Sequence, residues 1–529
     1  MKPLAEPALQ AVKDGKLKLH PMRWKKVFIH WLENIHDWCI SRQIWWGHRI
    51  PVYTCEGCNE VVASIKPPKA CKKCQADSFR QEDDVLDTWF SSQLWPFATL
   101  GWPKETDDLR YFYPTDSLVT GPDIIFFWVA RMVMMGIEFM GELPFHDVYF
   151  NGIIRDAQGR KMSKSLGNGI DPLEMVKKYS ADAIRFSLLD LSAEGQDINL
   201  SERDFEIGRN FSNKVWNAFR FLWINLEEKN LSHANQDFVK DALDAENLDL
   251  ADRWILSRCQ RTIRKVTRAL EQFKFHEATE TIYNFFWREY CDWYLELIKT
   301  RLYDTENAEQ RDIALATAIY VLKSILKMLH PIIPFITEEL WLKVRSDEDA
   351  ESIMISNWPL EVRAFIDDSS EKEVELLQNL IGAVRNIRGE MNVPPNKTAT
   401  VIIAGNAGGK EVLDSILSHR EYFEQLANVD TLECRRNGHR PPKSATAVVG
   451  GFEIFLPLEG LIDFNVERAR LQKDIARLEK QLEGLNAKLQ SQDFLSKAPE
   501  EIVKLEKKKK VDFESNLEKL KSNLESLAA

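Results

Sequence analysis

The sequence predicts an α/β segment with a cysteine-rich insert, then a helical domain, a small α+β connector and an antiparallel coiled coil at the C-terminus. Three patterns predict this order. A strand pattern, a polar loop and a capped helix follow one another over 148–179, amphipathic stripes dominate 206–397, and leucines recur at heptad spacing after residue 461. The 529 residues, 44% of them hydrophobic, suffice for several domains of roughly 100–200 residues each.

Changes in composition place the expected domain boundaries. The first 50 residues are basic and rich in tryptophan, and the last segment carries the leucine repeat. The segments in chain order are 1–50, the insert 51–84, the α/β segment 85–205, the helical domain 206–397, the connector 398–460 and the terminal helices 461–529.

The α/β segment contains the clearest site for chemistry. Residues 148–154 have the pattern of a buried strand and lead into a loop rich in Gly, Ser and Lys. A helix should follow, with Asp171 as its cap and Pro172 at its first position. Because α/β folds bind ligands where strands end, this loop is the first place to look for a site.

The remaining elements are expected to be helices and a few strands. Apolar residues recur on successive turns from Trp254 to Leu270, and the connector alternates Val, Ile and Phe. Two apolar seams occur at the end of the chain, and the segment between them contains Pro499, which should interrupt the helix. Two helices joined by a short break favour an antiparallel hairpin within one molecule, and an intermolecular coiled coil is the alternative. The seams are Leu471, Ile475, Leu478, Leu482, Leu485 and Leu489, and then Phe513, Leu517, Leu520, Leu524 and Leu527.

Charge and hydropathy exclude some classes of protein. The net charge of −11 argues against a protein that binds nucleic acid through overall positive charge, so an RNA site must be a local patch. The apolar stretch from Asp123 is interrupted by Arg131 and Glu138 before the roughly 20 residues that a membrane span needs. No secretory signal is recognised in the first 20 residues, and we expect a cytoplasmic, reducing compartment.

Four cysteines in the insert have the spacing of a metal site. Cys55 and Cys58 form one pair and Cys71 and Cys74 the other, with twelve residues between the pairs. Four thiolates suit a tetrahedral, structural Zn²⁺ with no position left open for catalysis. Disulfides are the alternative, which a reducing compartment disfavours. The other cysteines, Cys39, Cys259, Cys291 and Cys434, show no paired spacing.

The loop after the predicted strand has the composition of a phosphate site. Lys161 and Lys164 lie three residues apart among small residues, where backbone amides can approach an anion. A solvated basic turn is the alternative for such a loop. The string Lys161-Met162-Ser163-Lys164-Ser165, however, resembles letter for letter the KMSKS signature of the class I aminoacyl-tRNA synthetases.

This resemblance implies a Rossmann-like catalytic half and an ATP-dependent reaction. An amino-acid carboxylate would attack the α-phosphate of ATP, with Mg²⁺, and the aminoacyl group would then pass to tRNA. By resemblance, Lys164 contacts ATP and stabilises the departing pyrophosphate, Lys161 assists, and Met162, Ser163 and Ser165 complete the ATP-binding loop.

The rest of the chain is similar to the valine branch of that class, which implies valine and tRNA-Val as partners. The similar stretches are 38–51, 84–92, 120–131, 328–341 and 385–395. The resemblance identifies 1–50 as the end of an editing insert, 206–397 as an anticodon-binding domain and 461–529 as a tRNA-binding arm. An isoleucine-specific relative is the alternative, since it shares the loop.

The resemblance also suggests two further groups of binding residues. Trp46 and Trp89 could form apolar walls around a small branched side chain, although tryptophans are more often core. Basic residues of the last helix could contact RNA, although such a run is usually a solvated face: Lys504, Lys507, Lys508, Lys509 and Lys510.

One signature of the class is not found in the sequence. The class carries a His-x-Gly-His string that binds ATP phosphates, and Gly47-His48-Arg49 is only superficially similar. We therefore expect a truncated or split enzyme that lacks most of the editing domain, is inactive alone and is a monomer. If the enzyme is split, another chain supplies its amino-terminal half. The alternatives are a non-catalytic tRNA-binding module and a coiled-coil assembly protein with a vestigial catalytic segment.

Overall fold

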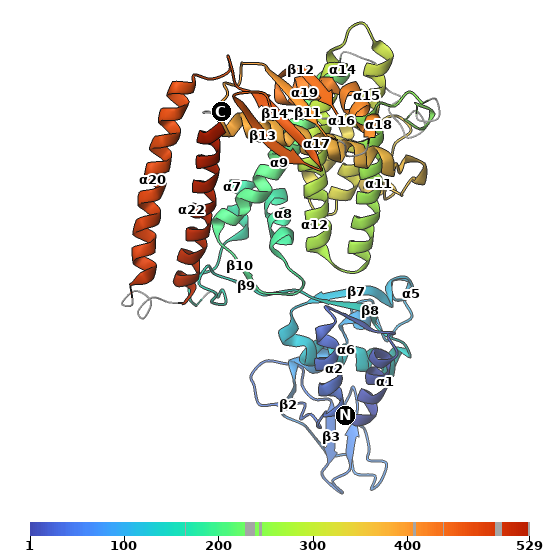
Figure 1. Cartoon of the computed structure of the whole chain (residues 1–529). Helices are drawn as coiled ribbons and strands as arrows, with labels where there is room; N and C mark the ends of the chain where they lie inside the picture. The colour runs from blue at the N-terminus through green and yellow to red at the C-terminus, as the bar shows by residue number, and fades with distance from the viewer. Residues whose placement is uncertain are drawn as a thin grey trace. The chain divides into compact units, whose positions relative to one another are not determined.

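The computed structural model describes residues 1–163, 165–227, 239–242, 246–405, 409–436, 439–491 and 500–526. The chain forms two compact units (Figure 1). The first comprises Met1–Trp216, Lys265–Ile282 and Leu329–Glu339, and the second comprises Asn217–Arg264, Tyr283–Met328 and Leu340–Ala529. In the described residues, no helix is long and apolar enough to cross a membrane.

A parallel three-stranded sheet is the centre of the first unit. Its order is β1 (Lys18–His20), β8 (Phe145–Phe150) and β7 (Thr115–Thr120), with Leu19 opposite Val148 and Val148 opposite Leu118. Helices α1 (Lys2–Lys13), α2 (Arg23–Glu33) and α6 (Ala130–Met140) contribute to one apolar core with these strands. Parallel strands that are covered by helices are the architecture expected of an α/β fold.

Several short helices and turns lie between the insert and α6 in the sequence. Helix α6 follows a π-helical turn and ends at Gly141, whose φ of +76° is the left-handed conformation that suits glycine. The short elements are α3 (Thr88–Ser92), α4 (Trp95–Ala98), α5 (Asp107–Phe112), the 3₁₀ turn Pro122–Ile124 and the π-helical turn Ile125–Val129.

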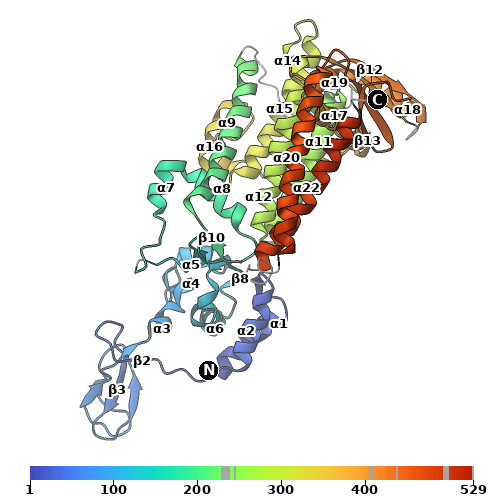
Figure 2. The same cartoon turned by 60° about the vertical axis from the view of Figure 1, so that its left-hand side comes forward.

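The cysteine-rich insert is a small antiparallel sheet on a two-stranded stalk. The sheet order is β4 (Val61–Ala63), β3 (Val52–Cys55) and β5 (Phe79–Gln81), and the stalk pairs β2 (Ser41–Arg42) with β6 (Val85–Leu86). Figure 2 shows β3 and its neighbours as a separate lobe beyond β2.

The predicted strand 148–154 is two strands in the structure, which corrects that expectation. Strand β8 ends at Phe150, and β9 (Ile154–Arg155) pairs in parallel with β10 (Ile198–Asn199). The break has a steric cause at Gly152, where a Cβ atom would lie 1.7 Å from the carbonyl oxygen of Gln196. Only glycine allows the two backbones to approach so closely.

Two helices follow β9 and close this part of the first unit. Helix α7 (Pro172–Tyr179) begins as predicted, with Pro172 at its start and the Asp171 carboxylate accepting from the N–H of Leu173 at 2.8 Å. Helix α8 (Ala181–Leu191) follows directly, and its residue Asp182 accepts from the backbone N–H groups of Phe335 and Ile336. A small apolar cluster around Met175, Ala183 and Phe205 joins α7, α8 and β10.

Helices make up most of the second half of the chain. They are α9 (Phe205–Glu227), α11 (Leu250–Glu271), α12 (Phe275–Asn284), the π-helix Phe285–Tyr294, α13 (Leu295–Leu297), α14 (Lys299–Tyr303), α15 (Ala308–Leu329), α16 (Pro334–Val344) and α17 (Asp368–Glu390). In the second unit, Asp252 is fully buried and is paired with Arg301 at 2.7 Å and with the hydroxyl of Tyr294 at 2.9 Å. Such pairing satisfies a buried charge, and arginines of α11 also pair with Glu371 of α17.

A mixed sheet and two long helices end the second unit. The sheet order is β12 (Val429–Arg435), β11 (Ala399–Ala404), β14 (Phe452–Pro457) and β13 (Ser444–Val449), with α18 (Gly409–Ser418) and α19 (Arg420–Ala427) inserted between β11 and β12. Helices α20 (Phe464–Gln490) and α22 (Glu500–Ser526) lie side by side in both views (Figures 1 and 2). The ion pairs Lys488–Glu506 and Lys521–Glu479 join the two helices, and this order of partners shows that the helices run antiparallel.

Candidate functional site

The Lys- and Ser-rich loop lies in the first unit between β9 and α7 (Figure 1). It leaves β9 through a turn at Gly159, with a φ of +77°, and returns so that Arg155 and Lys161 form an antiparallel bridge. The loop is therefore a folded structure with its own backbone pairing.

Asp156 is the acceptor at the base of this loop. Its carboxylate accepts from the N–H groups of Gln158 at 3.0 Å and Arg160 at 2.9 Å, and from the Arg160 Nε at 2.7 Å. The side-chain amide of Asn168 donates to the same carboxylate at 2.9 Å. These donors, the Asn168 amide foremost, lower the pKa of Asp156 to about 2, so the group is ionised at neutral pH.

Asn168 joins the base of the loop to its middle. Besides Asp156, its Nδ2 donates to the carbonyl of Lys161 at 3.4 Å, and its Oδ1 accepts from the N–H of Ser163 at 3.0 Å. The Asn168 amide thus connects Asp156, at the start of the loop, with the backbone of Lys161 and Ser163 in the signature. Neither residue was predicted from the sequence; the available signals were the Asp156-to-Arg160 spacing around a glycine and an Asn directly after Gly167.

The residues expected to bind ATP have different environments. The Lys161 ammonium lies 3.6 Å from a carboxylate oxygen of Asp123, and both side chains are more than half exposed. The hydroxyls of Ser163 and Ser165 are 3.1 Å apart, and the Ser163 hydroxyl accepts from the N–H of Leu166. Lys164, expected to be the principal catalytic residue, lies outside the described residues.

A cavity of about 720 Å³ lies beneath the loop. Met162 packs against the apolar cluster of α7, α8 and β10, and it lines the cavity with Ser163 and the backbone of Gly167 and Gly169. The apolar wall comprises Ile154, Ile170, Met175, Ile184, Leu188, Leu200 and Phe205. Met162 therefore anchors the loop to the first unit through an apolar contact.

The two tryptophans expected in an amino-acid pocket differ in exposure. Trp89 is partly buried, stacks on Phe127 with ring centroids 5.7 Å apart, and lies in α3, which Asp87 caps. Trp46 is 90% exposed and follows the exposed Ile44 and Trp45. Their role in binding valine remains a prediction.

The four cysteines of the insert converge on one point. Their sulfur atoms all lie within 4.8 Å of one another, and the Cys55–Cys74 and Cys58–Cys71 sulfur pairs are each 3.6 Å apart. A disulfide needs about 2.05 Å, whereas a tetrahedral ion with Zn–S bonds of about 2.3 Å separates its sulfurs by about 3.8 Å. The geometry therefore fits a four-thiolate metal site.

Backbone groups around Cys71 favour its thiolate form, whereas the pKa of Cys58 is raised to about 12, because the backbone hydrogen bond at Glu60, which lowers it, is outweighed by the neighbouring cysteine side chains. Hydrogen bonds from the N–H groups of Cys74 and Lys73 lower the pKa of Cys71 to about 7. Gly57 gives the first pair its close turn, since a Cβ atom there would lie 3.3 Å from the Cys74 sulfur and 3.0 Å from the Ala76 methyl. Outside the cluster, Cys39 is exposed, Cys434 is partly buried, and Cys259 and Cys291 are buried.

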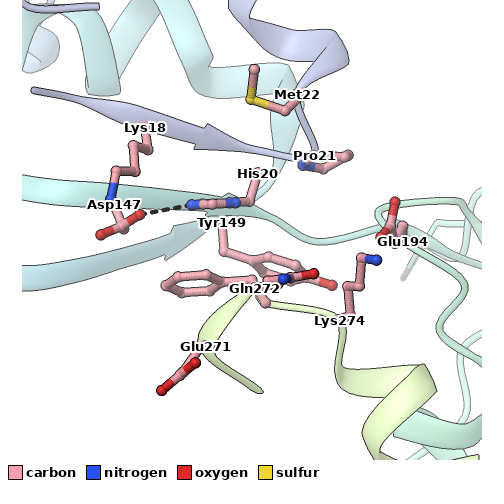
Figure 3. A pocket seen from close by; sticks show the side chains of 11 residues that line it. Lys18, His20, Pro21, Met22, Asp147, Tyr149, Glu194, Glu271, Gln272 and Lys274 are labelled. Carbon is pink, nitrogen blue, oxygen red and sulfur yellow. Dashed lines mark hydrogen bonds and ion pairs between the residues drawn. The ribbon is translucent and has the colours of Figure 1, made fainter. Parts of the chain in front are cut away.

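A second cavity, of about 470 Å³, lies on the polar face of the parallel sheet (Figure 3). His20 of β1 is paired with Asp147 of β8 at 2.7 Å and stacks on Phe273 with ring centroids 4.3 Å apart. Cations and carboxylates are mixed around it: Lys18, Lys274, Glu194 and Glu271. This cavity shares no lining residue with the cavity beneath the loop.

The basic run of α22 is partly paired. Lys509 lies 3.2 Å from Glu506, and Lys510 lies 3.7 Å from Glu514. Lys507 and Lys508 are exposed, and no ion pair joins either of them to another described residue. Within this run, Lys507 and Lys508 are therefore the residues with the most available charge.

Comparison with known proteins gives these sites a context. A family described as tRNA synthetases class I (I, L, M and V) matches residues 1–201, the anticodon-binding domain of tRNA ligase matches 252–403, and the valyl tRNA synthetase tRNA binding arm matches 463–528. Among solved structures, a methionyl-tRNA synthetase of Mycobacterium tuberculosis bound by methionyl-adenylate has a TM-score of 0.49 and 20% identity, covering 64% of this chain and 61% of that one.

Two curated relatives cover the whole chain. The valine–tRNA ligase of Thermotoga maritima is 47% identical over 528 residues, which is 100% of this chain and 57% of that protein. The valine–tRNA ligase of Clostridium acetobutylicum is 45% identical over 528 residues, 100% of this chain and 58% of that protein. The chain thus spans less than two thirds of the length of these relatives.

These matches define a class I aminoacyl-tRNA synthetase fold, with an α/β catalytic part followed by a helical anticodon-binding domain. Both the whole-chain identity and the terminal arm distinguish one branch of that class. Over its whole length the chain is similar to the valyl-tRNA synthetases, and its last residues match their tRNA binding arm.

Proposed function

We propose that this chain supplies the signature loop, the anticodon-binding domain and the terminal arm of a valine–tRNA ligase. The reaction would activate valine with ATP to valyl-adenylate and then transfer valine to tRNA-Val. The observation that carries the proposal is the Lys161–Ser165 loop, held between β9 and α7 in a chain that is 47% identical to a valine–tRNA ligase over its whole length.

The loop would act on the departing pyrophosphate. When the valine carboxylate attacks the α-phosphate, the bond to the β-phosphate oxygen breaks and negative charge develops on pyrophosphate. Lys164, assisted by Lys161, would stabilise that charge, and Mg²⁺ would neutralise the ATP phosphates. The exposed ion pair of Lys161 with Asp123 contributes only about 0–1 kcal/mol, so Lys161 is free to exchange it for a phosphate.

The same proposal assigns roles to the insert and the arm. Cys55, Cys58, Cys71 and Cys74 would hold a structural Zn²⁺ in a zinc-ribbon-like fold, since their sulfur spacing suits four thiolate ligands. Helices α20 and α22 would form a coiled-coil arm that contacts tRNA through the lysines of α22. Trp46 and Trp89 would border valine in a monomeric enzyme of the cytoplasm.

A second candidate function is a tRNA-binding subunit without activity of its own. It is favoured by the matches of residues 252–403 to the anticodon-binding domain of tRNA ligase and of residues 463–528 to the valyl tRNA synthetase tRNA binding arm. In that case another chain would supply the amino-terminal half, or none would.

Valine-dependent ATP–pyrophosphate exchange separates the two functions. We expect little exchange with the chain alone, and exchange once the remaining part of the Thermotoga maritima enzyme is added. Isoleucine and threonine serve as substrate controls. Binding of tRNA-Val without exchange in either mixture would favour the non-catalytic subunit, and exchange with isoleucine in place of valine would contradict the proposed substrate.

A further inference from the structure

Two side chains outside the five-residue signature, Asp156 and Asn168, hold the signature loop in place through hydrogen bonds. We call this pair the bracket. Asp156 accepts from the backbone of Gln158 and Arg160 and from the Arg160 side chain, which folds the entry of the loop around one carboxylate. Asp156 is 7% exposed, so water competes little for these bonds.

Asn168 connects this entry to the signature itself. Its amide donates to the Asp156 carboxylate at 2.9 Å and accepts from the N–H of Ser163 at 3.0 Å. An amide is the group required here, because one end must donate to a carboxylate while the other accepts from a backbone N–H. Leucine would make neither bond, and aspartate would make only the second.

We propose that Asn168 is a positioning residue, which with Asp156 fixes the backbone of Lys161–Ser163 so that the signature lysines reach the leaving pyrophosphate. This inference rests on the proposed function. Met162 supplies the apolar anchor on the cavity side, and the Asp156–Asn168 pair supplies the polar one. Together these contacts hold the described residues Lys161–Ser163 from two sides, and small displacements of catalytic groups can cost about 100-fold in rate.

Kinetics of the complemented enzyme test the proposal. We expect Asn168→Ala to lower kcat for exchange by about 10- to 100-fold with a smaller change in KM for ATP, because the lost contact orients groups rather than binding substrate directly. Asn34→Ala, an exposed amide at the end of α2 in the same unit, is the control and should leave kcat unchanged.

The pH dependence distinguishes positioning from general destabilisation. Asn168→Asp puts two carboxylates in contact, which raises the pKa of the pair, so a shared proton restores the bridge as the pH falls. The activity of Asn168→Asp relative to wild type should therefore rise between pH 8 and pH 5.5, while that of Asn168→Ala stays constant. The double variant Asp156→Asn, Asn168→Asp should recover part of the activity at pH 8, because donor and acceptor are exchanged.

Trypsin provides a readout that needs no activity. In the chain alone, cleavage after Arg160 and Lys161 should be several-fold faster in Asn168→Ala than in wild type or Asn34→Ala, with an unchanged melting temperature. Unchanged cleavage, unchanged kcat, or identical pH profiles of the Asp and Ala variants would overturn the positioning role. Absence of exchange in the wild-type mixture would instead contradict the proposed function.

Discussion

At the scale of single residues, the lysines of the signature should contribute to different degrees. If Lys164 acts on charge that develops in the transition state, Lys164→Ala should slow valyl-adenylate formation by orders of magnitude and leave tRNA affinity nearly unchanged. Lys161→Ala should have a smaller effect. Pyrophosphate exchange and tRNA binding of the complemented enzyme measure both, and wild-type exchange in Lys164→Ala would remove this residue from the mechanism.

The residues around these lysines show how far sequence reasoning reaches. A five-residue string located the loop, because its letters are specific. The string did not reveal that Met162 is an apolar anchor or that Asp156 and Asn168 hold the loop, since these roles depend on which groups meet in space. Asp156 lies five residues before the signature, and its spacing to Arg160 around a glycine indicates a turn but does not show which groups the carboxylate meets.

At the scale of elements, the cysteine insert should depend on metal. The chain, purified without chelators and under reducing conditions, should carry about one zinc, since metal binding and folding are coupled at such sites. Cys55→Ser should lose the metal and make the segment 51–84 more sensitive to protease. Cys434→Ser, a free thiol of β12 outside the cluster, is the matched control. A metal-free wild-type chain would contradict the prediction.

The lysines of α22 should also differ in their effect on tRNA. Residues 463–529 contain 14 Lys and Arg against 13 Asp and Glu, so any attraction for RNA comes from how the charges are distributed. Replacing Lys507 and Lys508 by Gln should weaken tRNA-Val binding and make its salt dependence shallower, by about one unit of slope for each lost phosphate contact. Replacing the paired Lys509 and Lys510 should do less. Equal, unchanged slopes in both variants would show that the lysines only solvate the helix.

The elements themselves were predictable where periodicity is long. The leucine spacing in 471–489 indicated a helix, and the structure has α20 over Phe464–Gln490. The strand expected over 148–154 was wrong in its second half, because the close approach of Gly152 to Gln196 breaks it. That contact joins residues far apart in the sequence, and no local pattern contains it.

At the scale of the whole molecule, charge and architecture favour tRNA contacts that are confined to particular surfaces. A net charge of −11 gives the chain no overall attraction for a polyanion, so local positive patches must supply it. The first turns of α20 are held in the second unit, since Leu471 is fully buried and Arg470 donates to the backbone carbonyl of Glu390 at the end of α17. The far end of the arm can therefore be removed without disturbing the sheet that precedes it.

Shortening the arm should separate tRNA binding from valine activation. We expect that replacing residues 482–517 by a short Gly/Ser linker leaves valine-dependent exchange unchanged, because the signature loop and its bracket lie entirely in the first unit. The KM for tRNA-Val should rise about 10-fold or more, since several phosphate contacts are lost together, and the loss should shrink at high salt. Loss of exchange in this variant, or an unchanged KM for tRNA-Val, would contradict an arm that serves tRNA binding alone.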